Sequence, residues 1–392
     1  MAKNSAGRLV VVPCDPIGVY ERVGYDWLQR YFNPTGMFRE VYVLSPLEKG
    51  ERKAHGMTIV EVPEDQFVQK IKEIKPDVVR AYGGYWPCDL VCRSRVDGIP
   101  IIVSIHDVRP ELLHRSIRHM DLVLVLTNEI QNQVLKAGVS KSRIRYLPNR
   151  VDRSVFNPVT DPALIQSVAS RFPTGKHILH IGRRTREKNQ DTIIRALALL
   201  PSDYSCIFIG SGDRAPFVAI AEELGVNNRC FWLDSVKNSE LPIWYSWCDC
   251  FCFPSRFPSE GFPLVSLEAA ACATPMVASD APPMNEYLIH DESACLVKEY
   301  ENPSALAAAI RKVCDNPEYR TKIKNGILKV AERFDLAVVD KMEADIYREA
   351  MTLTSVSLPR QLGIAGWRVQ SAISWRLNAL RSRLNNVFSA GA

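Results

Sequence analysis

Two loops in the second half of the chain carry residues that could bind a phosphorylated sugar. The first follows an apolar, strand-like run and extends from Gly182 to Asn189. Four cations lie between Arg183 and Lys188 at the expected start of a helix, where unpaired backbone N–H groups already favour anions. This loop predicts a phosphate site, and a solvated basic turn is the alternative.

The second loop, from Pro254 to Pro263, follows another apolar run and leads into an Ala-rich helix. Gly261 lets the backbone approach a ligand closely, and Pro263 suits a first helical turn. Glu260 lies in the loop and Glu268 lies in the helix, so both carboxylates can face one cleft. Carboxylates accept hydrogen bonds from hydroxyl groups, which favours a sugar or a ribose as the ligand. A helix cap with an exposed glutamate is the alternative that spacing alone leaves open.

Strands and helices must hold these loops, and the chain contains both in alternation. Apolar runs of strand length alternate with helical patterns, which predicts an α/β fold of doubly wound parallel sheets. The strands expected in the first half are 9–12, 41–44, 58–62, 78–81, 101–105 and 122–126. Those expected in the second half are 178–181, 207–209, 230–233, 250–253, 276–278 and 295–297. Ligands collect at the carboxyl ends of such strands, so the loops that follow the strands are the expected site.

The 392 residues are enough for two such domains. We expect an N-terminal domain at residues 1–156 and a second domain at 157–335, joined at the proline-bounded segment 148–158. Residues 336–355 are expected to form a helix that returns to the first domain. Residues 356–392 form a basic amphipathic tail with five arginines and no acid.

Composition excludes several other classes of protein. With 46% hydrophobic and 24% charged residues the chain is not disordered, and its apolar runs are shorter than the ~18 residues of a membrane span. The first residues do not resemble an export signal, so we expect a cytoplasmic protein. The eleven cysteines have no framework spacing, which favours reduced, buried thiols over disulfides or a metal site.

Several short motifs in combination resemble the retaining GT-B glycosyltransferases of family 4, also called glycosyl transferases group 1. The motifs are Gly182-Arg183 with Lys188, Pro254-Ser255, Glu260-Gly261-Phe262 with Glu268, and Thr274-Pro275. The resemblance covers residues 176–315 well and the first half of the chain loosely. It implies two Rossmann-like domains that face a cleft, with the acceptor on the side of residues 1–156 and a nucleotide sugar held mainly by residues 157–335. It also implies retention at the anomeric carbon, without a metal or other cofactor.

The resemblance implies a role for each candidate catalytic or binding residue in the second half of the chain. Arg183 and Lys188 neutralise the donor diphosphate, including the charge that grows as it leaves. Glu260 binds hydroxyl groups of the donor sugar, and Glu268 holds the nucleotide ribose.

Further donor-binding residues follow from the same resemblance. Gly261, Phe262 and Pro263 form the loop at the sugar and the phosphates. In the first half, His106 follows a strand and is implied to lie beside the donor sugar, although a lone histidine is more often structural. Gly18 stands where the family has a pair of glycines.

The chain departs from the family pattern at three positions. The glycine usual after the linker asparagine is Arg150, and the glycine usual before Thr274 is Ala273. The first glycine pair is reduced to Gly18, which affects the expectation for the acceptor side rather than for the donor diphosphate.

The function expected from these residues is transfer of a hexosyl unit from a nucleotide-diphosphate sugar, with UDP favoured over GDP. The acceptor is expected to be a glycan or a lipid-linked molecule of cell-envelope or polysaccharide synthesis. One alternative is an NAD(P)-dependent enzyme, because Gly210–Ala215 fits a dinucleotide-binding fingerprint and Asp234 could bind a ribose. The other is a GT-B binding protein that has lost turnover.

The sequence of the tail is compatible with two kinds of partner, a membrane surface or a protein surface. Its arginines are Arg360, Arg368, Arg376, Arg381 and Arg383, and its apolar residues recur at mostly three- and four-residue steps. Such a helix at residues 360–392 can lie on an anionic membrane, which would put the protein on the inner face of the membrane, or it can pack on the first domain or another subunit. Nucleic acid is not an expected partner, because the basic residues are not interleaved with aromatic ones.

Overall fold

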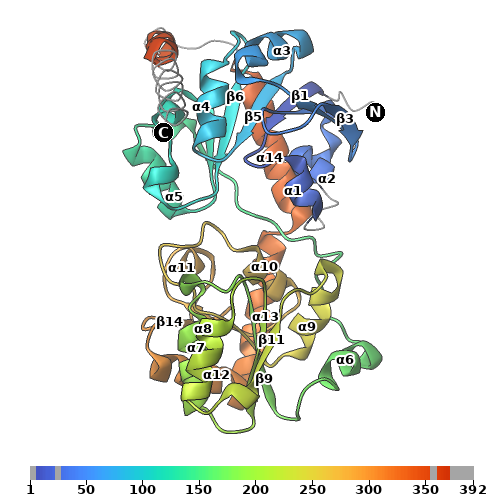
Figure 1. Ribbon diagram of the computed structural model, residues 1–392, viewed down its shortest axis with the longest axis vertical. Coiled ribbons are helices and arrows are strands. Elements are labelled where there is room, and N and C mark those ends of the chain that lie inside the picture. Colours follow the sequence, from blue (N-terminus) through green and yellow to red (C-terminus); the bar gives the residue numbers. More distant parts are fainter. Residues whose placement is uncertain (1–5, 23–27, 354–359, 371–392) are drawn as a thin grey trace, which may run out of the picture. The chain divides into compact units, whose positions relative to one another are not determined.

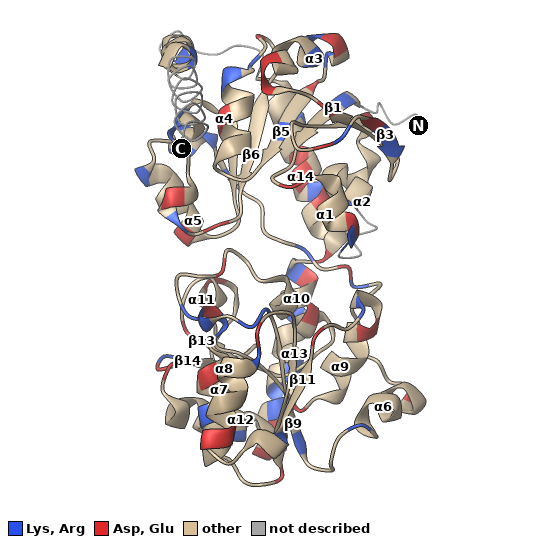
Figure 2. Ribbon diagram, viewed as in Figure 1, with Lys and Arg blue, Asp and Glu red and all other residues tan. Residues whose placement is uncertain are grey.

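The computed structural model describes three stretches of the chain, residues 6–22, 28–353 and 360–370 (Figure 1). The chain forms two compact units, one made of Met1–Val125, Ile130–Tyr146 and Lys341–Ala392, the other of Leu126–Glu129 and Leu147–Asp340. Acidic and basic residues are interspersed over the ribbon of each unit (Figure 2).

The first unit contains an eight-stranded sheet in the order β3-β4-β2-β1-β5-β6-β7-β8. The strands are β1 (Ala6–Val12), β2 (Phe38–Ser45), β3 (Glu51–Ala54), β4 (Met57–Glu61), β5 (Val78–Tyr82), β6 (Ile101–Ile105), β7 (Leu122–Val125) and β8 (Ile144–Tyr146). All neighbours pair in parallel except β3 with β4. The central strands β5 and β6 are buried along their whole length, which explains why their sequences are apolar apart from Arg80 and Ser104.

The helices of the first unit come from both ends of the chain. They are α1 (Ile17–Arg22), α2 (Leu28–Phe32), α3 (Phe67–Ile74), α4 (Trp86–Arg93), α5 (Asn128–Lys136) and α14 (Leu336–Met351). α14 begins in the second unit and continues in the first, where Tyr347 packs against the ring of Phe38 with centroids 5.1 Å apart.

The second unit contains a six-stranded parallel sheet in the order β11-β10-β9-β12-β13-β14. The strands are β9 (Lys176–Ile181), β10 (Tyr204–Ile209), β11 (Cys230–Leu233), β12 (Cys250–Phe253), β13 (Met276–Ser279) and β14 (Cys295–Val297). The helices are α6 (Pro162–Ala169), α7 (Gln190–Leu199), α8 (Ala215–Glu223), α9 (Leu241–Trp247), α10 (Leu264–Ala271), α11 (Met284–Tyr287), α12 (Pro303–Asp315) and α13 (Pro317–Arg333).

The α/β fold predicted from the sequence, with two doubly wound sheets, is confirmed. Every expected strand is present, whereas β3 and β8 were not expected. All eleven cysteines are unpaired, and ten of them are buried, in agreement with the expected reduced thiols.

The described part of the tail is a helix at residues 360–370 that packs on the first unit. Ile364 and Trp367 are buried, and the Trp367 indole Nε1 donates a hydrogen bond of 2.9 Å to Asp89. The guanidinium of Arg115 lies 4.8 Å from the centre of the Trp367 ring. Packing on the first domain is therefore correct for this stretch.

The rest of the tail, with Arg376, Arg381 and Arg383, lies outside the described residues. Among the residues that are described, no helix combines the length and the apolar character needed to cross a bilayer.

The C-terminal end of α10 has an alanine where a glycine would be favoured. The Thr274 N–H donates to the Ala269 carbonyl at 2.9 Å, and Ala273 between them adopts a left-handed conformation with φ of 55°. This closure of a helix usually uses glycine, because a side-chain Cβ is strained there.

We expect Ala273→Gly to raise the free energy of unfolding by about 0.5 to 1 kcal/mol, because relief of the left-handed strain exceeds the extra entropy of an unfolded glycine. Chemical denaturation would measure it. The control is Ala308→Gly in the exposed face of α12, which should lower the same free energy by about 1 kcal/mol. Equal signs for the two variants would contradict the assignment of strain to Ala273.

Candidate functional site

The candidate site lies in the second unit, at the carboxyl ends of the central strands β9 and β12, where the strand order of the sheet reverses. Strands β9 and β12 are neighbours in the sheet although β10 and β11 separate them along the chain. The loop after β9 contains Arg183 and Lys188, and the loop after β12 contains Glu260. The structure therefore brings both loops to the position where doubly wound sheets bind their ligands.

Lys188 and Glu260 form the central contact of this site. Lys188 ends the short 3₁₀ helix η6 (Arg186–Lys188), and its Nζ lies 2.5 Å from Glu260 Oε1. Their side chains are 18% and 11% exposed, so the pair is partly shielded from water but still reachable. The ammonium also lies 5.4 Å from the centre of the Phe253 ring. The site thus holds a cation for phosphate next to an anion for hydroxyl groups.

The adjacent arginines differ in what they can do. Arg183 is exposed, and its side chain has no hydrogen-bond partner within the described part of the chain. Arg184 is buried and donates to the Gly212 carbonyl at 3.0 Å, to the Leu233 carbonyl at 2.9 Å and to Asp234 at 2.8 Å. The prediction that all four cations of this loop form a phosphate site is therefore wrong for Arg184, because its guanidinium is bound within the protein.

Close packing against the loop after β9 explains the glycine turn that fits a dinucleotide fingerprint. Gly210 and Gly212 have φ of 150° and 111°. A Cβ on Gly210 would lie 2.0 Å from the Gly182 carbonyl oxygen, and one on Gly212 would lie 3.0 Å from that of Arg184. These glycines let the β9 loop pass closely over the turn, so close packing accounts for them without a dinucleotide.

The loop from Gly261 to Pro263 is fixed by its neighbours. Phe262 is buried, with its ring 4.6 Å from that of Tyr287 and 5.3 Å from that of Phe334. Its carbonyl accepts a hydrogen bond of 2.7 Å from Asn149 Nδ2. Phe262 therefore contributes its backbone to any ligand site, because its side chain belongs to the core.

Glu268 lies in α10 with one oxygen bound by a buried tyrosine. Its Oε2 accepts a hydrogen bond of 3.0 Å from the Tyr245 hydroxyl. Burial raises the pKa of the Glu268 carboxyl to about 7, and the bond from Tyr245 acts in the opposite direction. A ligand that donates hydroxyl hydrogens would favour the ionised form.

Two of the expected site residues belong to the first unit. His106 follows β6, its ring stacks on Tyr82 with centroids 6.0 Å apart, and its Nε2 is buried without a hydrogen-bond partner. Burial, and then the charge of Arg80, lowers the pKa of His106 to about 4, so the ring is neutral at pH 7. Gly18 lies in α1, where an added Cβ would come no closer than 3.9 Å to another side chain, at Glu21.

The departure at Arg150 has a structural explanation. Arg150 does not have a positive φ, so its position does not require glycine. Its guanidinium forms an ion pair of 3.1 Å with Asp340, and both side chains are buried. The two residues join the start of the second unit to its end.

One group of potential metal ligands is found among the described residues. Ligand atoms of His290, Asp291 and Cys295 lie within 4.8 Å of one another. Asp291, however, already accepts hydrogen bonds of 2.7 Å from Lys312 and from the Tyr319 hydroxyl. We therefore assign no metal to this group.

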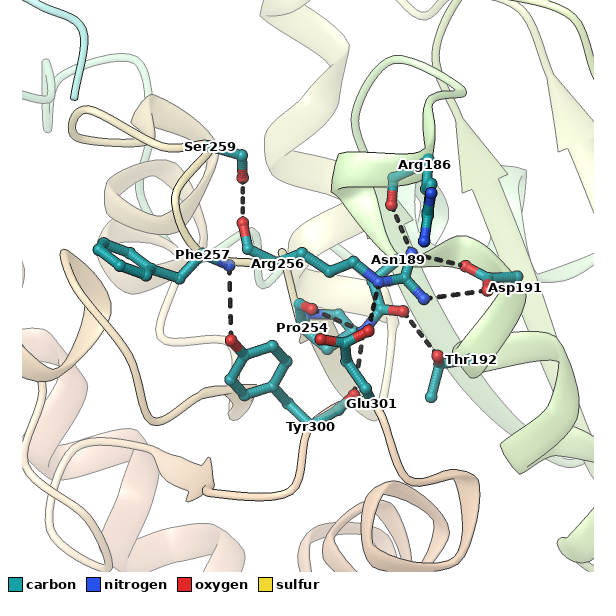
Figure 3. A network of polar contacts seen from close by, with 10 residues as sticks. All are labelled: Arg186, Asn189, Asp191, Thr192, Pro254, Arg256, Phe257, Ser259, Tyr300 and Glu301. Atoms are coloured by element: carbon teal, nitrogen blue, oxygen red, sulfur yellow. Dashed lines mark hydrogen bonds and ion pairs between the residues drawn. The ribbon is translucent and has the colours of Figure 1, made fainter. Parts of the chain in front are cut away.

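Sequence reasoning missed two residues that hold the loops together. Arg256 bonds to Asp191 and Glu301, and Asn189 bonds to the carbonyls of Pro254 and Tyr300 (Figure 3). Both residues lie within the two loops described above, from Gly182 to Asn189 and from Pro254 to Pro263, but their partners are far away in the sequence.

Comparisons with known proteins agree with this arrangement. Residues 165–329 match the family model described as glycosyl transferases group 1. A D-inositol 3-phosphate glycosyltransferase of Xylanimonas cellulosilytica is 27% identical over 58% of this chain, and the match spans only 57% of that relative. The lipopolysaccharide core biosynthesis mannosyltransferase LpsB of Rhizobium meliloti is 26% identical over 80% of this chain and 99% of its own.

Solved structures resemble the chain over most of its length. Anabaena HepE in complex with UDP and glucose has a TM-score of 0.70 and 19% identity, covering 88% of this chain and all of HepE. A glycosyltransferase from Rickettsia africae has a TM-score of 0.73 and 16% identity, covering 89% of this chain and 99% of its own. These likenesses show the GT-B fold.

Proposed function

Because this chain carries the glycosyl transferases group 1 domain on a GT-B fold, we propose that it transfers a hexosyl unit from a nucleotide-diphosphate sugar. The observation that carries the proposal is the Lys188–Glu260 pair at the switch between β9 and β12. The Lys188 ammonium and the exposed Arg183 guanidinium would stabilise the diphosphate as it leaves. Glu260 would accept hydrogen bonds from the sugar hydroxyl groups.

The proposed reaction retains the configuration at the anomeric carbon, as in family 4. An inverting enzyme needs a general base opposite the leaving group. Glu260 is engaged by Lys188 and Glu268 by Tyr245, so neither carboxylate is placed as a free base. The leaving phosphate oxygen would then accept the acceptor proton. Lys188 and Arg183 supply the positive charge that a metal would otherwise bring, so the proposed reaction needs none.

UDP is the proposed nucleotide, supported by the solved structures of HepE with UDP and with UDP-glucose. Glu268 would bind the ribose, and the backbone of Gly261 and Phe262 would donate to the donor. His106 and Gly18 are the proposed contributors from the first unit.

The proposed acceptor is a glycan or a lipid-linked molecule of the cell envelope. The name of LpsB, a lipopolysaccharide core mannosyltransferase, supports this class of acceptor. Arg360 and Arg368 are bound within the first unit, to Asp121 and to the Arg95 carbonyl. The other arginines of the tail, Arg376, Arg381 and Arg383, support the proposed contact of residues 360–392 with an anionic membrane surface on its cytoplasmic side.

Thermal melting with UDP, GDP and NAD, each added separately, tests the proposal. A ligand at about 100 times its dissociation constant stabilises the folded protein by about 2.7 kcal/mol, which raises the melting temperature by a few degrees. We expect a rise with UDP and none with NAD. A rise with GDP alone would change the donor but keep the reaction, whereas a rise with NAD alone would overturn the proposal.

A further inference from the structure

The two loops of the candidate site are tied together by one arginine. Arg256 lies at the start of the loop that carries Glu260, yet its side chain reaches across to the loop that carries Lys188 (Figure 3). We call Arg256 and its side-chain partners Asp191, Glu301 and the Arg186 carbonyl the Arg256 clamp.

The clamp is bidentate on Asp191, in the first turn of α7. Arg256 Nη1 and Nη2 each donate to one oxygen of Asp191 at 3.0 Å, and Nε donates to Glu301 at 2.8 Å. The Arg256 side chain is 17% exposed, so this fork is partly shielded from water. A planar fork holds its partner in a fixed direction, which a lysine would not do.

The clamp also fixes the backbone of η6, the turn that ends at Lys188. Arg256 Nη1 donates to the Arg186 carbonyl at 2.5 Å, and the Arg256 backbone N–H donates to the Glu187 carbonyl at 2.8 Å. The two residues before Lys188 are therefore held by the same arginine.

The residue after Lys188 is held from the same side. Asn189 is completely buried in a left-handed conformation, and its Nδ2 donates to the carbonyls of Pro254 and Tyr300 at 2.9 Å each. Lys188 thus lies between two anchored neighbours.

The other end of Arg256 leads to Glu260. The Arg256 carbonyl accepts a hydrogen bond of 2.5 Å from the Ser259 hydroxyl, and Ser259 is the residue before Glu260. One residue consequently contacts the immediate surroundings of both members of the Lys188–Glu260 pair.

We propose that Arg256 is a positioning residue of the donor site, which holds the Lys188 loop and the Glu260 loop in register so that the ammonium and the carboxylate face the donor together. This inference rests on the proposed function. Arg256 is not a further phosphate ligand, because its guanidinium nitrogens donate to Asp191, Glu301 and the Arg186 carbonyl.

The test compares Arg256→Ala and Arg256→Lys with the wild-type full chain. We expect both variants to bind UDP roughly tenfold more weakly and to lower kcat/KM with the donor roughly 100-fold. If only the charge of Arg256 mattered, the lysine variant would restore both values, and the inference would be wrong. Arg320→Ala is the matched control, because Arg320 pairs with Asp249 at 3.2 Å, immediately before β12, at the opposite end of that strand from the donor loop.

A double-mutant cycle separates positioning from direct binding. With Lys188→Ala already present, Arg256→Ala should weaken UDP binding little further, because the arginine acts through Lys188. An undiminished additional loss would overturn the inference.

Hydrogen exchange provides a measurement that does not depend on any nucleotide. Amides of residues 186–192 and 254–260 should exchange faster in Arg256→Ala, and at the wild-type rate in Arg320→Ala. Unchanged exchange in Arg256→Ala would refute the clamp. If the wild-type protein binds neither UDP nor GDP while exchange behaves as expected, the proposed function has failed and the clamp has not.

Discussion

Lys188→Ala is expected to lower turnover of the nucleotide sugar by about 100- to 1000-fold while leaving the protein folded. The Lys188 Nζ lies 2.5 Å from Glu260, in a partly shielded position where charge acts strongly. Its loss removes the group that would stabilise the leaving diphosphate. Release of UDP or GDP from the donor chosen by thermal melting would measure turnover.

Lys176→Ala is the matched control for that experiment. Lys176 begins β9, the strand that precedes the Lys188 loop, and forms an ion pair with Asp315. The same substitution is therefore made at the opposite end of that strand from the candidate site. A pair of this exposure contributes about 0 to 1 kcal/mol to stability. We expect unchanged turnover, and equal losses in the two lysine variants would refute the role of Lys188.

Glu260→Gln should separate binding of the nucleotide from transfer of the sugar. The glutamine is neutral and cannot form an ion pair with the ammonium, so the positive charge of Lys188 is left available to bind phosphate. We expect UDP to bind as tightly as before or more tightly, whereas turnover falls by about 100-fold because the sugar loses its carboxylate partner. Weaker UDP binding with normal turnover would contradict this division of roles.

The sequence predicted the strands well because most of them are buried on both faces. Val78–Tyr82 and Ile101–Ile105 are central in their sheet, and a central parallel strand has a nearly continuous apolar sequence. The missed strands lack that signal. Glu51–Ala54 is an antiparallel edge strand of partly exposed residues, and Ile144–Tyr146 has only three residues.

The motifs predicted which loops meet, but not the roles of neighbouring side chains within them. Arg183 and Arg184 are adjacent in the sequence, yet the first is exposed and the second is buried against the Gly210 turn. The direction of each side chain depends on the backbone of the loop and on a strand that comes later in the chain. Arg256 was missed for the same reason, because its partner Asp191 lies 65 residues away.

Glu343→Ala is expected to lower the free energy of unfolding of the first unit by about 3 to 5 kcal/mol. Arg80 lies in the middle of β5, and its guanidinium is 3.2 Å from Glu343 in α14, with side-chain exposures of 1% and 2%. The guanidinium also donates to the Ser104 hydroxyl at 2.5 Å and lies 4.9 Å from the centre of the Tyr82 ring. Removal of the carboxylate would leave a buried positive charge without its anion. Denaturation followed by circular dichroism would measure the loss.

Two further variants test whether the loss of stability in Glu343→Ala is caused by the buried, unpaired charge of Arg80. Glu349→Ala, on the same helix, removes an ion pair with Arg145 whose side chains are 32% and 37% exposed, so it should cost at most about 1 kcal/mol. The double variant Arg80→Met/Glu343→Leu removes both buried charges and should be more stable than Glu343→Ala alone, because apolar side chains of similar size need no partner. If the double variant were less stable than the single one, the pair itself, rather than the unpaired arginine, would be what holds α14 to β5.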